Sequence, residues 1–374
     1  MCSYTSDVDL DLVFLGTSGS VPTARRAPAA TLVRRGGERL LFDCGEGTQR
    51  QFLRSGIGLI ELADVFVTHY HADHYLGLPG MLKTFALRGR ELPMTVHGPP
   101  GLVDLFASLQ RIFGRLPYRL DLVELRPGDA LERDGYRIVV FKVSHGAAAN
   151  GYALVEPPRP GRFDVEAARA LGVEPGPRYG ALQRGETILL EGGRAVRPQQ
   201  VLGPPRPGRK VVLSGDTRPA RSVLEVARDA DVLVHDATFA DEERERAEET
   251  GHATAAQAAE VGRLAGVGLL ALTHLSNRYF GPEIAREARA VFADAVVPRD
   301  FDTIDVPFPE RGRPRLVRGG ALGHGEEAEL VGGHGAAGGG PGRDRGRGDS
   351  DDPGVGRDPV GAAARSGNPP GRSR

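Results

Sequence analysis

Thr68-His69-Tyr70-His71-Ala72-Asp73-His74 is the stretch that decides how this chain folds and what it can bind. It places three imidazoles and one carboxylate directly after the apolar run 63–67. That run has the length and the β-branched character of a strand, so the stretch is predicted to be a loop at the strand's C-terminal end. In a loop, side chains two positions apart can converge on one point. His69 and His71 can therefore bind one metal ion, and Asp73 and His74 a second one beside it.

The alternative to a metal site is that these histidines are solvated and bind nothing, as isolated loop histidines often do. Imidazole and carboxylate are, however, the ligands that zinc takes. Three further residues of these types end strand-like apolar runs: His145 after 136–143, Asp216 after 210–215 and His274 after 267–273. One such residue alone would more often make a structural hydrogen bond. Two four-coordinate ions that share one carboxylate need about seven ligands, and the loop and the strand ends together supply them.

The H-x-H-x-D-H pattern, followed by isolated His, Asp and His, resembles the metallo-β-lactamase superfamily. Other segments narrow the resemblance to the ribonuclease Z family of tRNA 3′-processing endonucleases: 14–20, 42–49, 204–218, 234–239 and 251–254. The most specific parts are residues 42–49 and the long insertion before Asp216. The similarity extends from about residue 9 to about residue 309. It implies an α/β fold, the metallo-β-lactamase αββα four-layer sandwich, with a protruding inserted arm.

The resemblance also implies a role for each site residue. One Zn²⁺ would be bound by His69, His71, His145 and Asp216, and the other by Asp73, His74, Asp216 and His274, with Asp216 bridging. Mn²⁺ fits the same nitrogen and oxygen set. Asp73 is the expected proton acceptor for the attacking water. His252, oriented by Asp236, resembles the residue that protonates the leaving oxygen, and its alternative is a surface histidine at a helix N-terminus. Asp43 is expected to orient a ligand histidine.

The expected activity is removal of the 3′ trailer from tRNA precursors, with a 3′-hydroxyl left on the tRNA. The expected partner is precursor tRNA, and the resemblance also implies a homodimer. Two alternatives stay open: a superfamily hydrolase acting on small phosphodiesters or thioesters, which would lack the arm, and a noncatalytic RNA-binding protein, which would have lost ligands. Residues 24–27 are Ala-Arg-Arg-Ala, where many bacterial members have Arg-Asn. This departure leaves open how precursors with an encoded CCA are treated. The sequence also leaves open the balance of endo- and exonucleolytic trimming.

Composition agrees with an intracellular enzyme. The chain has 374 residues, 40% of them hydrophobic, and only two cysteines, which excludes a disulfide framework. It has no apolar run of about 18 residues and no secretory signal pattern, so no membrane association and a cytoplasmic location are expected. The net charge of −1 does not by itself predict an RNA partner. Between Glu156 and Lys210, however, ten Lys and Arg stand against six Asp and Glu.

We expect a nuclease domain at 1–310, with an inserted tRNA-binding arm at 156–208, and a disordered tail at 311–374. Strands are predicted near 11–15, 31–34, 39–42, 63–67, 94–97, 136–143, 151–155, 210–215, 231–235 and 268–273, and helices near 49–53, 77–87, 101–113, 220–228, 254–264 and 282–292. In the arm, dense proline and glycine leave a floppy loop as the alternative. Helical periodicity at 163–171 and strand-like runs at 186–190 and 195–201 instead favour a folded arm. The tail is rich in Gly, Arg, Asp and Pro, with few apolar residues to bury.

Overall fold

The computed structural model describes residues 8–58 and 61–319, which form two β-sheets packed face to face. The first sheet has the order β17-β16-β1-β2-β3-β4-β5-β6. Its strands are β1 (Leu10–Gly16), β2 (Ala30–Arg35), β3 (Glu38–Phe42), β4 (Asp64–Phe66), β5 (Met94–Gly98), β6 (Leu120–Glu124), β16 (Thr303–Asp305) and β17 (Arg315–Val317).

The second sheet has the order β15-β14-β13-β12-β9-β8-β7. Its strands are β7 (Ala130–Arg133), β8 (Tyr136–Lys142), β9 (Asn150–Val155), β12 (Lys210–Leu213), β13 (Val232–Asp236), β14 (Leu269–Thr273) and β15 (Ala295–Val296).

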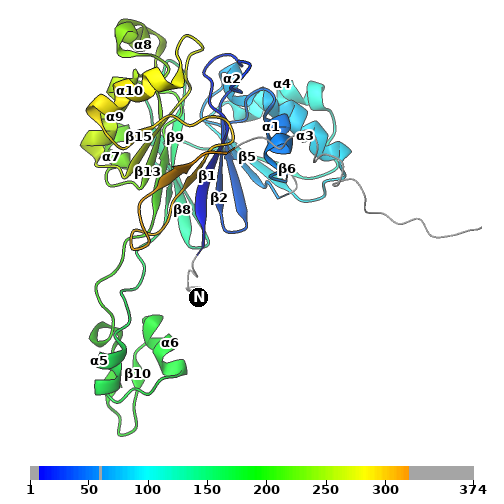
Figure 1. The fold of residues 1–374 in the computed structure, drawn as a ribbon. Helices are drawn as coiled ribbons and strands as arrows, with labels where there is room; N and C mark the ends of the chain where they lie inside the picture. The colour runs from blue at the N-terminus through cyan, green and yellow to red at the C-terminus, as the bar shows by residue number, and fades with distance from the viewer. Residues whose placement is uncertain (1–7, 59–60, 320–374) are drawn as a thin grey trace, which may run out of the picture. The chain divides into compact units, whose positions relative to one another are not determined.

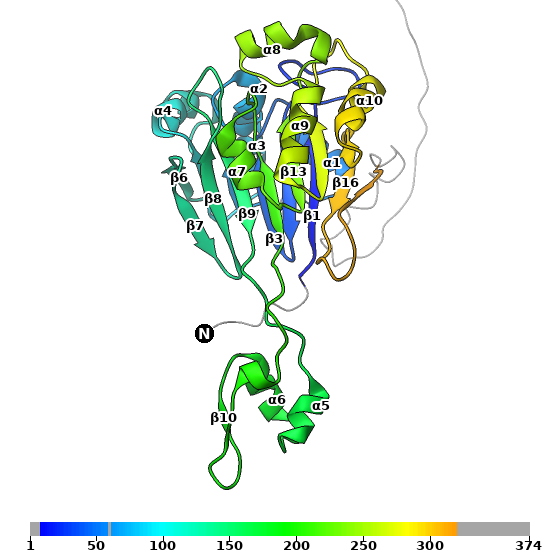
Figure 2. The ribbon, with the colours of Figure 1, turned by 90° about the vertical axis from the view of Figure 1, so that its left-hand side faces the viewer.

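Helices cover the outer face of each sheet (Figures 1 and 2). On the first sheet lie α1 (Thr48–Ser55), α3 (Gly77–Leu87) and α4 (Leu102–Phe113), and on the second α7 (Arg221–Ala227), α9 (Ala255–Ala265) and α10 (Gly281–Val291). Two short helices, α2 (Ala72–Tyr75) and α8 (Arg244–Thr250), complete this part of the chain. The layers are helix, sheet, sheet and helix, which confirms the predicted αββα sandwich.

Strand β1 shows why the inner strands of the sandwich are largely apolar. Successive side chains of a strand point to opposite faces. Leu12 and Phe14 pack into the core between the two sheets, whereas Val13 and Leu15 pack against the helices outside. Both faces are buried, so a continuous apolar run is required instead of an alternating one.

Chain direction brings the predicted ligands to one edge of the fold. Strands β12, β13 and β14 are parallel, so their C-terminal ends lie together. Asp216 follows the end of β12, Asp236 is the last residue of β13, and His274 follows β14. The edge of one sheet therefore assembles three residues that are far apart in sequence.

The inserted arm is folded around a small core of its own. It contains α5 (Val165–Ala170), α6 (Pro177–Gln183), β10 (Ile188–Leu189), β11 (Ala195–Val196) and the 3₁₀ turn η1 (Pro198–Gln200). Five buried side chains form its core: Ala168, Val173, Leu182, Val196 and Val201. The helix predicted at 163–171 is present as α5, but the strand predicted at 195–201 ends at Val196 and gives way to the turn. Helix α6 was not predicted.

The boundary expected at residue 310 is wrong. Strand β17 (Arg315–Val317) pairs antiparallel with β16, so the sandwich continues past residue 311. The carboxylate of Asp302 also accepts hydrogen bonds from Arg318 and from the backbone amide of Gly319. The rest of the expected tail, 320–374, lies outside the described residues. Among the residues that are described, no helix combines the length and the hydropathy that a membrane crossing requires.

Candidate metal centre

The histidine-rich stretch follows β4, as predicted, but it is not a loop throughout. His69 lies outside any helix or strand, and His71, with an extended backbone, is the N-cap of the single-turn helix α2. Asp73 and His74 belong to that turn. The turn places Asp73 and His74 beside His69 and His71. It also directs Asp73 and His74 toward His274, which follows β14.

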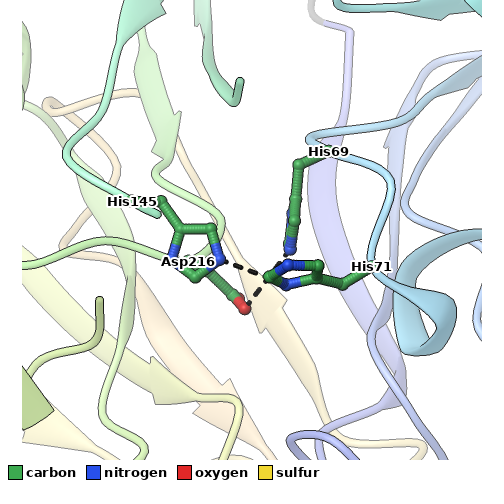
Figure 3. Close-up of side chains that lie close together, drawn as sticks. All are labelled: His69, His71, His145 and Asp216. Atoms are coloured by element: carbon green, nitrogen blue, oxygen red, sulfur yellow. Dashed lines mark hydrogen bonds and ion pairs between the residues drawn. The ribbon is translucent and has the colours of Figure 1, made fainter. Parts of the chain in front are cut away.

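One group of ligand atoms comes from His69, His71, His145 and Asp216, which lie within 4.8 Å of one another (Figure 3). The Nε2 atom of His145 lies 3.2 Å from Nδ1 of His71. The Nε2 atom of His69 lies 3.7 Å from Oδ2 of Asp216. The histidine loop of the first sheet and two strand ends of the second therefore meet at one point.

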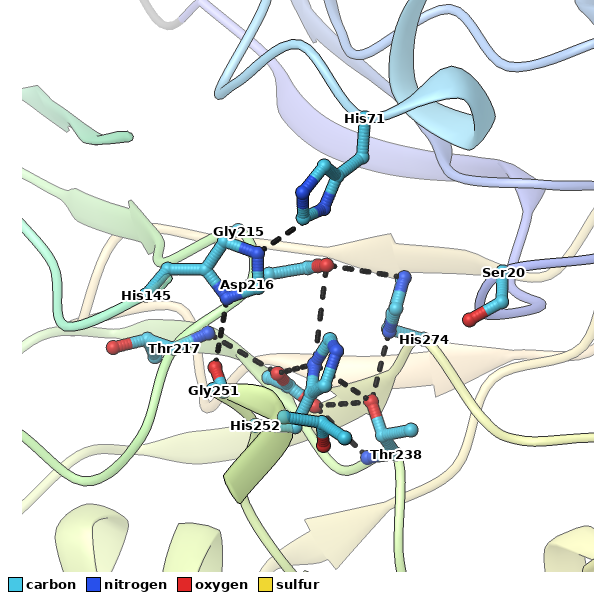
Figure 4. Close-up of polar contacts among 12 residues, drawn as sticks. Ser20, His71, His145, Gly215, Asp216, Thr217, Thr238, Gly251, His252 and His274 are labelled. Atoms are coloured by element: carbon cyan, nitrogen blue, oxygen red, sulfur yellow. Dashed lines mark hydrogen bonds and ion pairs between the residues drawn. The ribbon is translucent and has the colours of Figure 1, made fainter. Parts of the chain in front are cut away.

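A second group of ligand atoms comes from Asp73, His74 and His274, again within 4.8 Å of one another. The Oδ2 atom of Asp216 lies 3.3 Å from Nε2 of His74 and 3.3 Å from Nε2 of His274. Figure 4 shows Asp216 directed toward His274. Asp216 thus stands between the two groups, in the position of a bridging carboxylate.

The chemistry of these groups fits a dinuclear site for divalent cations. Nε2 of His69 is buried and has no hydrogen-bond partner among the described residues, as expected of a nitrogen directed at a metal ion. Burial, followed by the charge of His74, lowers the pKa of His69 to about 2, so this ring is a neutral donor. Although burial disfavours a charge on His74, the Asp216 and Asp43 carboxylates raise its pKa. A divalent cation would take the place of that proton.

The other ring nitrogen of three histidines is held by a neighbour, so that Nε2 faces the centre. Nδ1 of His74 donates to Asp43 Oδ2 at 2.8 Å, the contact expected from the sequence. Nδ1 of His145 donates to the Gly251 carbonyl at 2.8 Å, and Nδ1 of His274 to Thr238 Oγ1 at 2.8 Å. Such contacts fix the tautomer and the direction of each ring.

Two of these partners, Thr238 and Gly251, were not predicted. Both lie in segments that carry the family resemblance, but the resemblance implies no role for Thr238. Gly251 accepts through its backbone carbonyl, which every residue possesses, so the amino-acid type at this position could not reveal the contact.

His252 is held by Asp236 beside this centre. Its Nδ1 lies 2.7 Å from Asp236 Oδ2, and the residue is only 9% exposed, so it is not a surface histidine. Burial opposes a charge on the ring, but the Asp236 carboxylate raises the pKa of His252 to about 9. Asp236 also accepts hydrogen bonds from the amides of Thr217 and Thr238 and from the Thr238 hydroxyl. Ligand atoms of Asp216, Asp236, His252 and His274 also lie within 4.8 Å of one another. Both oxygens of Asp236 already accept hydrogen bonds, which favours the orienting role expected for it over metal binding.

The loop after β1 holds the centre from the other side. The backbone amide of Ser20 donates to Asp73 Oδ2 at 2.7 Å. A Cβ atom on Gly19 would lie 2.6 Å from the His274 carbonyl oxygen, so only glycine fits at this position. The segment 14–20, noted in the sequence for its resemblance, therefore fixes both Asp73 and His274.

The remaining histidines and Cys44 lie away from the ligand atoms. His97 bonds Asp64 through Nε2 at 2.8 Å. His235 is buried in β13, and Cys44 is buried just after β3. His324 and His334 lie outside the described residues. In the loop 24–27, Arg26 is tied to Thr17 Oγ1 at 2.6 Å, whereas Arg25 is exposed.

Comparison with known proteins agrees with this geometry. Residues 24–149 match the model of the metallo-beta-lactamase superfamily. Ribonuclease Z of Methanosarcina acetivorans is 46% identical over 303 residues, which cover 80% of this chain and 99% of that protein. Ribonuclease Z of Haloferax volcanii is 50% identical over 302 residues, covering 79% and 95%. The crystal structure of human tRNase Z, short form, has a TM-score of 0.59 and 26% identity, covering 79% of this chain and 99% of that one. Identity of this size, over nearly the full length of these relatives, shows that the chain belongs to the ribonuclease Z family.

Proposed function

We propose that this chain is a zinc-dependent endoribonuclease that removes the 3′ trailer from tRNA precursors. Relatives named ribonuclease Z and a structural neighbour named tRNase Z support the RNA substrate and the reaction. The observation on which the chemistry rests is the position of Asp216 Oδ2, 3.7 Å from Nε2 of His69 in one group and 3.3 Å from Nε2 of His274 in the other. A carboxylate so placed supports two ions in one site.

The proposed ligand sets follow the two groups described above. His69, His71, His145 and Asp216 would hold one Zn²⁺, and Asp73, His74, Asp216 and His274 the other. Two such ions would lower the pKa of a water at the centre and neutralise charge on the scissile phosphate. The same nitrogen and oxygen donors would also accept Mn²⁺.

Asp73 would accept the proton of the attacking water. Its Oδ2 is bonded by the Ser20 amide at 2.7 Å and lies 3.1 Å from His274 Nε2, which leaves Oδ1 for the water. Burial opposes a charge on this carboxyl, but the hydrogen bond from His274 and the charge of His74 lower its pKa. Asp73 is therefore ionised, as a proton acceptor must be. The water oxygen forms a bond to phosphorus as the bond from phosphorus to the 3′-oxygen breaks.

His252 would donate a proton to the departing 3′-oxygen. With a pKa of about 9, the ring is protonated near neutral pH. Asp236 holds Nδ1, so the proton on Nε2 is the one available to the substrate. The products would be a tRNA body with a 3′-hydroxyl and a trailer with a 5′-phosphate.

The arm would supply affinity for the body of the tRNA. No residue of the proposed ligand sets lies within it. Several of its arginines are used in ion pairs, such as Arg169 with Glu166 and Arg184 with Glu186. Arg162 and Arg178 are exposed and make no side-chain ion pair among the described residues, so they are available to phosphates.

A cytoplasmic location and a homodimer belong to the same proposal and rest on the family resemblance. Exposed apolar side chains on the helices outside the first sheet, Leu53, Val103 and Ile112, are consistent with a second copy binding there. Sedimentation of the purified protein would test the dimer, and a monomer at micromolar concentration would contradict it.

The direct test is incubation of the purified chain with a 3′-extended tRNA precursor, with and without a chelator. We expect one cut that releases the trailer intact, and no cut after metal removal. Release of mononucleotides would indicate exonucleolytic trimming instead. Full activity in excess chelator would contradict the metal mechanism.

A second experiment separates this function from that of a small-molecule hydrolase of the same superfamily. Replacing Pro157–Pro207 by a short Gly-Ser linker should nearly abolish precursor cleavage while sparing hydrolysis of bis(p-nitrophenyl) phosphate. Precursor cleavage with an unchanged KM after this replacement would show that the arm does not recognise the substrate.

A further inference from the structure

Two stretches of chain connect the arm to the sandwich, and prolines limit how they can pair. One leg contains Pro157, Pro158 and Pro160, and the other Pro204, Pro205 and Pro207. Proline has no backbone amide hydrogen, so these residues cannot form a continuous ladder. Two isolated bridges pair these stretches, Arg159 with Arg206 and, nearer the arm, Phe163 with Leu202. At the first of them Arg159 and Arg206 exchange two backbone hydrogen bonds of 2.7 and 2.9 Å.

The side chains of the same two residues converge on Glu310, which lies in the segment between β16 and β17. Oε1 of Glu310 accepts from Nη1 of Arg159 at 2.8 Å and from Nη1 of Arg206 at 2.8 Å. Oε2 accepts from Nη2 of Arg159 at 2.8 Å. One carboxylate therefore bonds both legs at the bridge between Arg159 and Arg206. Its contact with Arg159 has the two-point geometry that makes arginine contacts strong and directional.

The ring of Phe308 packs against the guanidinium group of Arg159. The Arg159 guanidinium carbon lies 3.5 Å from the Phe308 ring centroid, and that of Arg209 lies 4.0 Å from the same centroid. Arg209 is itself buried and bonds Glu156 through Nε and Nη2 at 2.8 Å each. Glu156 also accepts from Arg35 of β2 at 2.9 Å. The legs are thus fixed to the sandwich by Glu156 on one side and by Phe308 and Glu310 on the other.

We infer that Glu310 is a positioning residue for RNA binding, because it locks the two legs together and so sets the direction in which the arm leaves the sandwich. The inference rests on the proposed function, in which the arm binds tRNA while the metal centre cuts it. An arm held in one direction keeps its RNA contacts at a fixed distance from the centre. If the arm is loosely held, its RNA-binding side chains spend less time beside a tRNA bound at the metal centre. Their effective concentration there is lower.

The first test is Glu310→Gln, which keeps the size of the side chain and removes its charge. We expect the KM for precursor tRNA to rise about tenfold, while kcat and the hydrolysis of bis(p-nitrophenyl) phosphate stay within about twofold. General electrostatics predicts the opposite, because losing an acid should strengthen RNA binding. An unchanged or lower KM would therefore overturn the inference.

Asp305→Asn is the matched control. Asp305 lies on β16 close to Glu310 in sequence, and its only ion-pair partner among the described residues is the exposed Arg315. The change therefore removes the same charge without touching the legs. It should leave the KM unchanged or slightly lower. Glu310→Asp, which retains the charge, should recover part of the lost affinity.

The second test measures the arm without RNA. In a Cys2→Ser background, spin labels on Glu191→Cys in the arm and Arg221→Cys on α7 would report the distance between arm and sandwich in the full chain. Glu310→Gln should broaden the distance distribution, and Asp305→Asn should not. An unbroadened distribution would overturn the inference even if precursor cleavage failed. Absence of precursor cleavage by the parent chain, with the broadening present, would instead count against the proposed function alone.

Discussion

His69 Nε2 lies 3.7 Å from Asp216 Oδ2, and the nitrogen is buried with no hydrogen-bond partner among the described residues. Two ligands bonded tetrahedrally to zinc at about 2.1 Å are separated by about 3.4 Å. The spacing is therefore close to that of two ligands of one ion, and too long for a hydrogen bond.

Replacing His71 tests this interpretation at little cost to folding, because His71 is exposed. His71→Ala should reduce bound zinc from about two ions per chain to about one and abolish precursor cleavage. Metal analysis after dialysis measures the bound zinc, and a cleavage assay measures the activity. Circular dichroism confirms that the variant is folded. A variant that retained both ions and full activity would show that His71 is not a ligand.

Asp73→Asn tests the role of Asp73 as proton acceptor separately from its structural hydrogen bond to the Ser20 amide. The amide oxygen can still accept the hydrogen bond from the Ser20 amide, so the loop after β1 should stay in place. We expect kcat to fall at least about 10³-fold, within the range for a lost acid or base. Single-turnover assays under saturating precursor measure it, and a loss within about tenfold would exclude the proposed role.

His252→Ala should lower the rate by about 10²–10⁴-fold on precursor tRNA. The loss should shrink on bis(p-nitrophenyl) phosphate, because nitrophenolate leaves without needing a proton. Rates on the two substrates, compared with those of the parent chain, provide the measurement. Equal losses on both would point to a structural role for His252 beside Asp236.

The positions of His145, Asp216 and His274 could be predicted because each follows a strand-like apolar run. The runs before Asp216 and His274 are buried on both faces, whereas β8 before His145 also has exposed residues. Such a run identifies a strand and its end, and parallel strands bring their ends to one edge. The spacing of the histidine stretch likewise predicted that its side chains converge. It did not predict the single turn α2, because four residues are too few to show helical periodicity.

The parts that could not be predicted depend on other signals. The density of glycine and proline around Pro177 predicted no regular element, yet proline is favourable at the first turn of a helix, and α6 begins with Pro177. Strands β16 and β17 have three residues each, too short for alternation to be recognised. Strand β16 is placed by pairing with β1 and β17 by pairing with β16, and the first of these is a long-range tertiary contact.

The arm arginines should contribute to salt dependence. The double variant Arg162→Ala, Arg178→Ala should weaken precursor binding and make the slope of log affinity against log salt shallower by about 1–2, because each lost phosphate contact removes about 0.7–0.9. Arg221→Ala on α7, 89% exposed and remote in sequence from the arm, is the control and should not change the slope. An unchanged slope in the double variant would show that these side chains do not meet phosphates.

Glu156 should make stability depend on pH. Burial tends to raise its pKa, but the hydrogen bonds from Arg209 and Arg35 lower it below the usual value. A carboxyl with a lowered folded-state pKa stabilises the fold above its unfolded pKa of about 4.3 and loses that contribution as pH falls through the folded value. Glu156→Gln should cost about 3 kcal/mol of unfolding free energy near pH 7, and the difference from the parent should shrink below about pH 4.

Urea unfolding at several pH values measures this difference. Glu166→Gln is the control, because the Glu166 side chain is 84% exposed and, within residues 8–58 and 61–319, pairs only with the exposed Arg169. It should change stability by less than about 1 kcal/mol at every pH. A difference between the Glu156 variant and the parent that did not vary with pH would contradict the ionised pair.

The small core of the arm has a consequence for proteolysis. Five buried side chains, four of them alanine or valine, and six partly buried ones make a core much smaller than those of the sandwich, so the arm should open locally at a lower free energy. Proteases cut a chain where it opens. A molecule nicked in the arm would still bind metal and hydrolyse small phosphodiesters, but would no longer recognise tRNA. Cleavage of the arm by a protease would thus abolish tRNA maturation and leave a folded hydrolase with its metal ions bound.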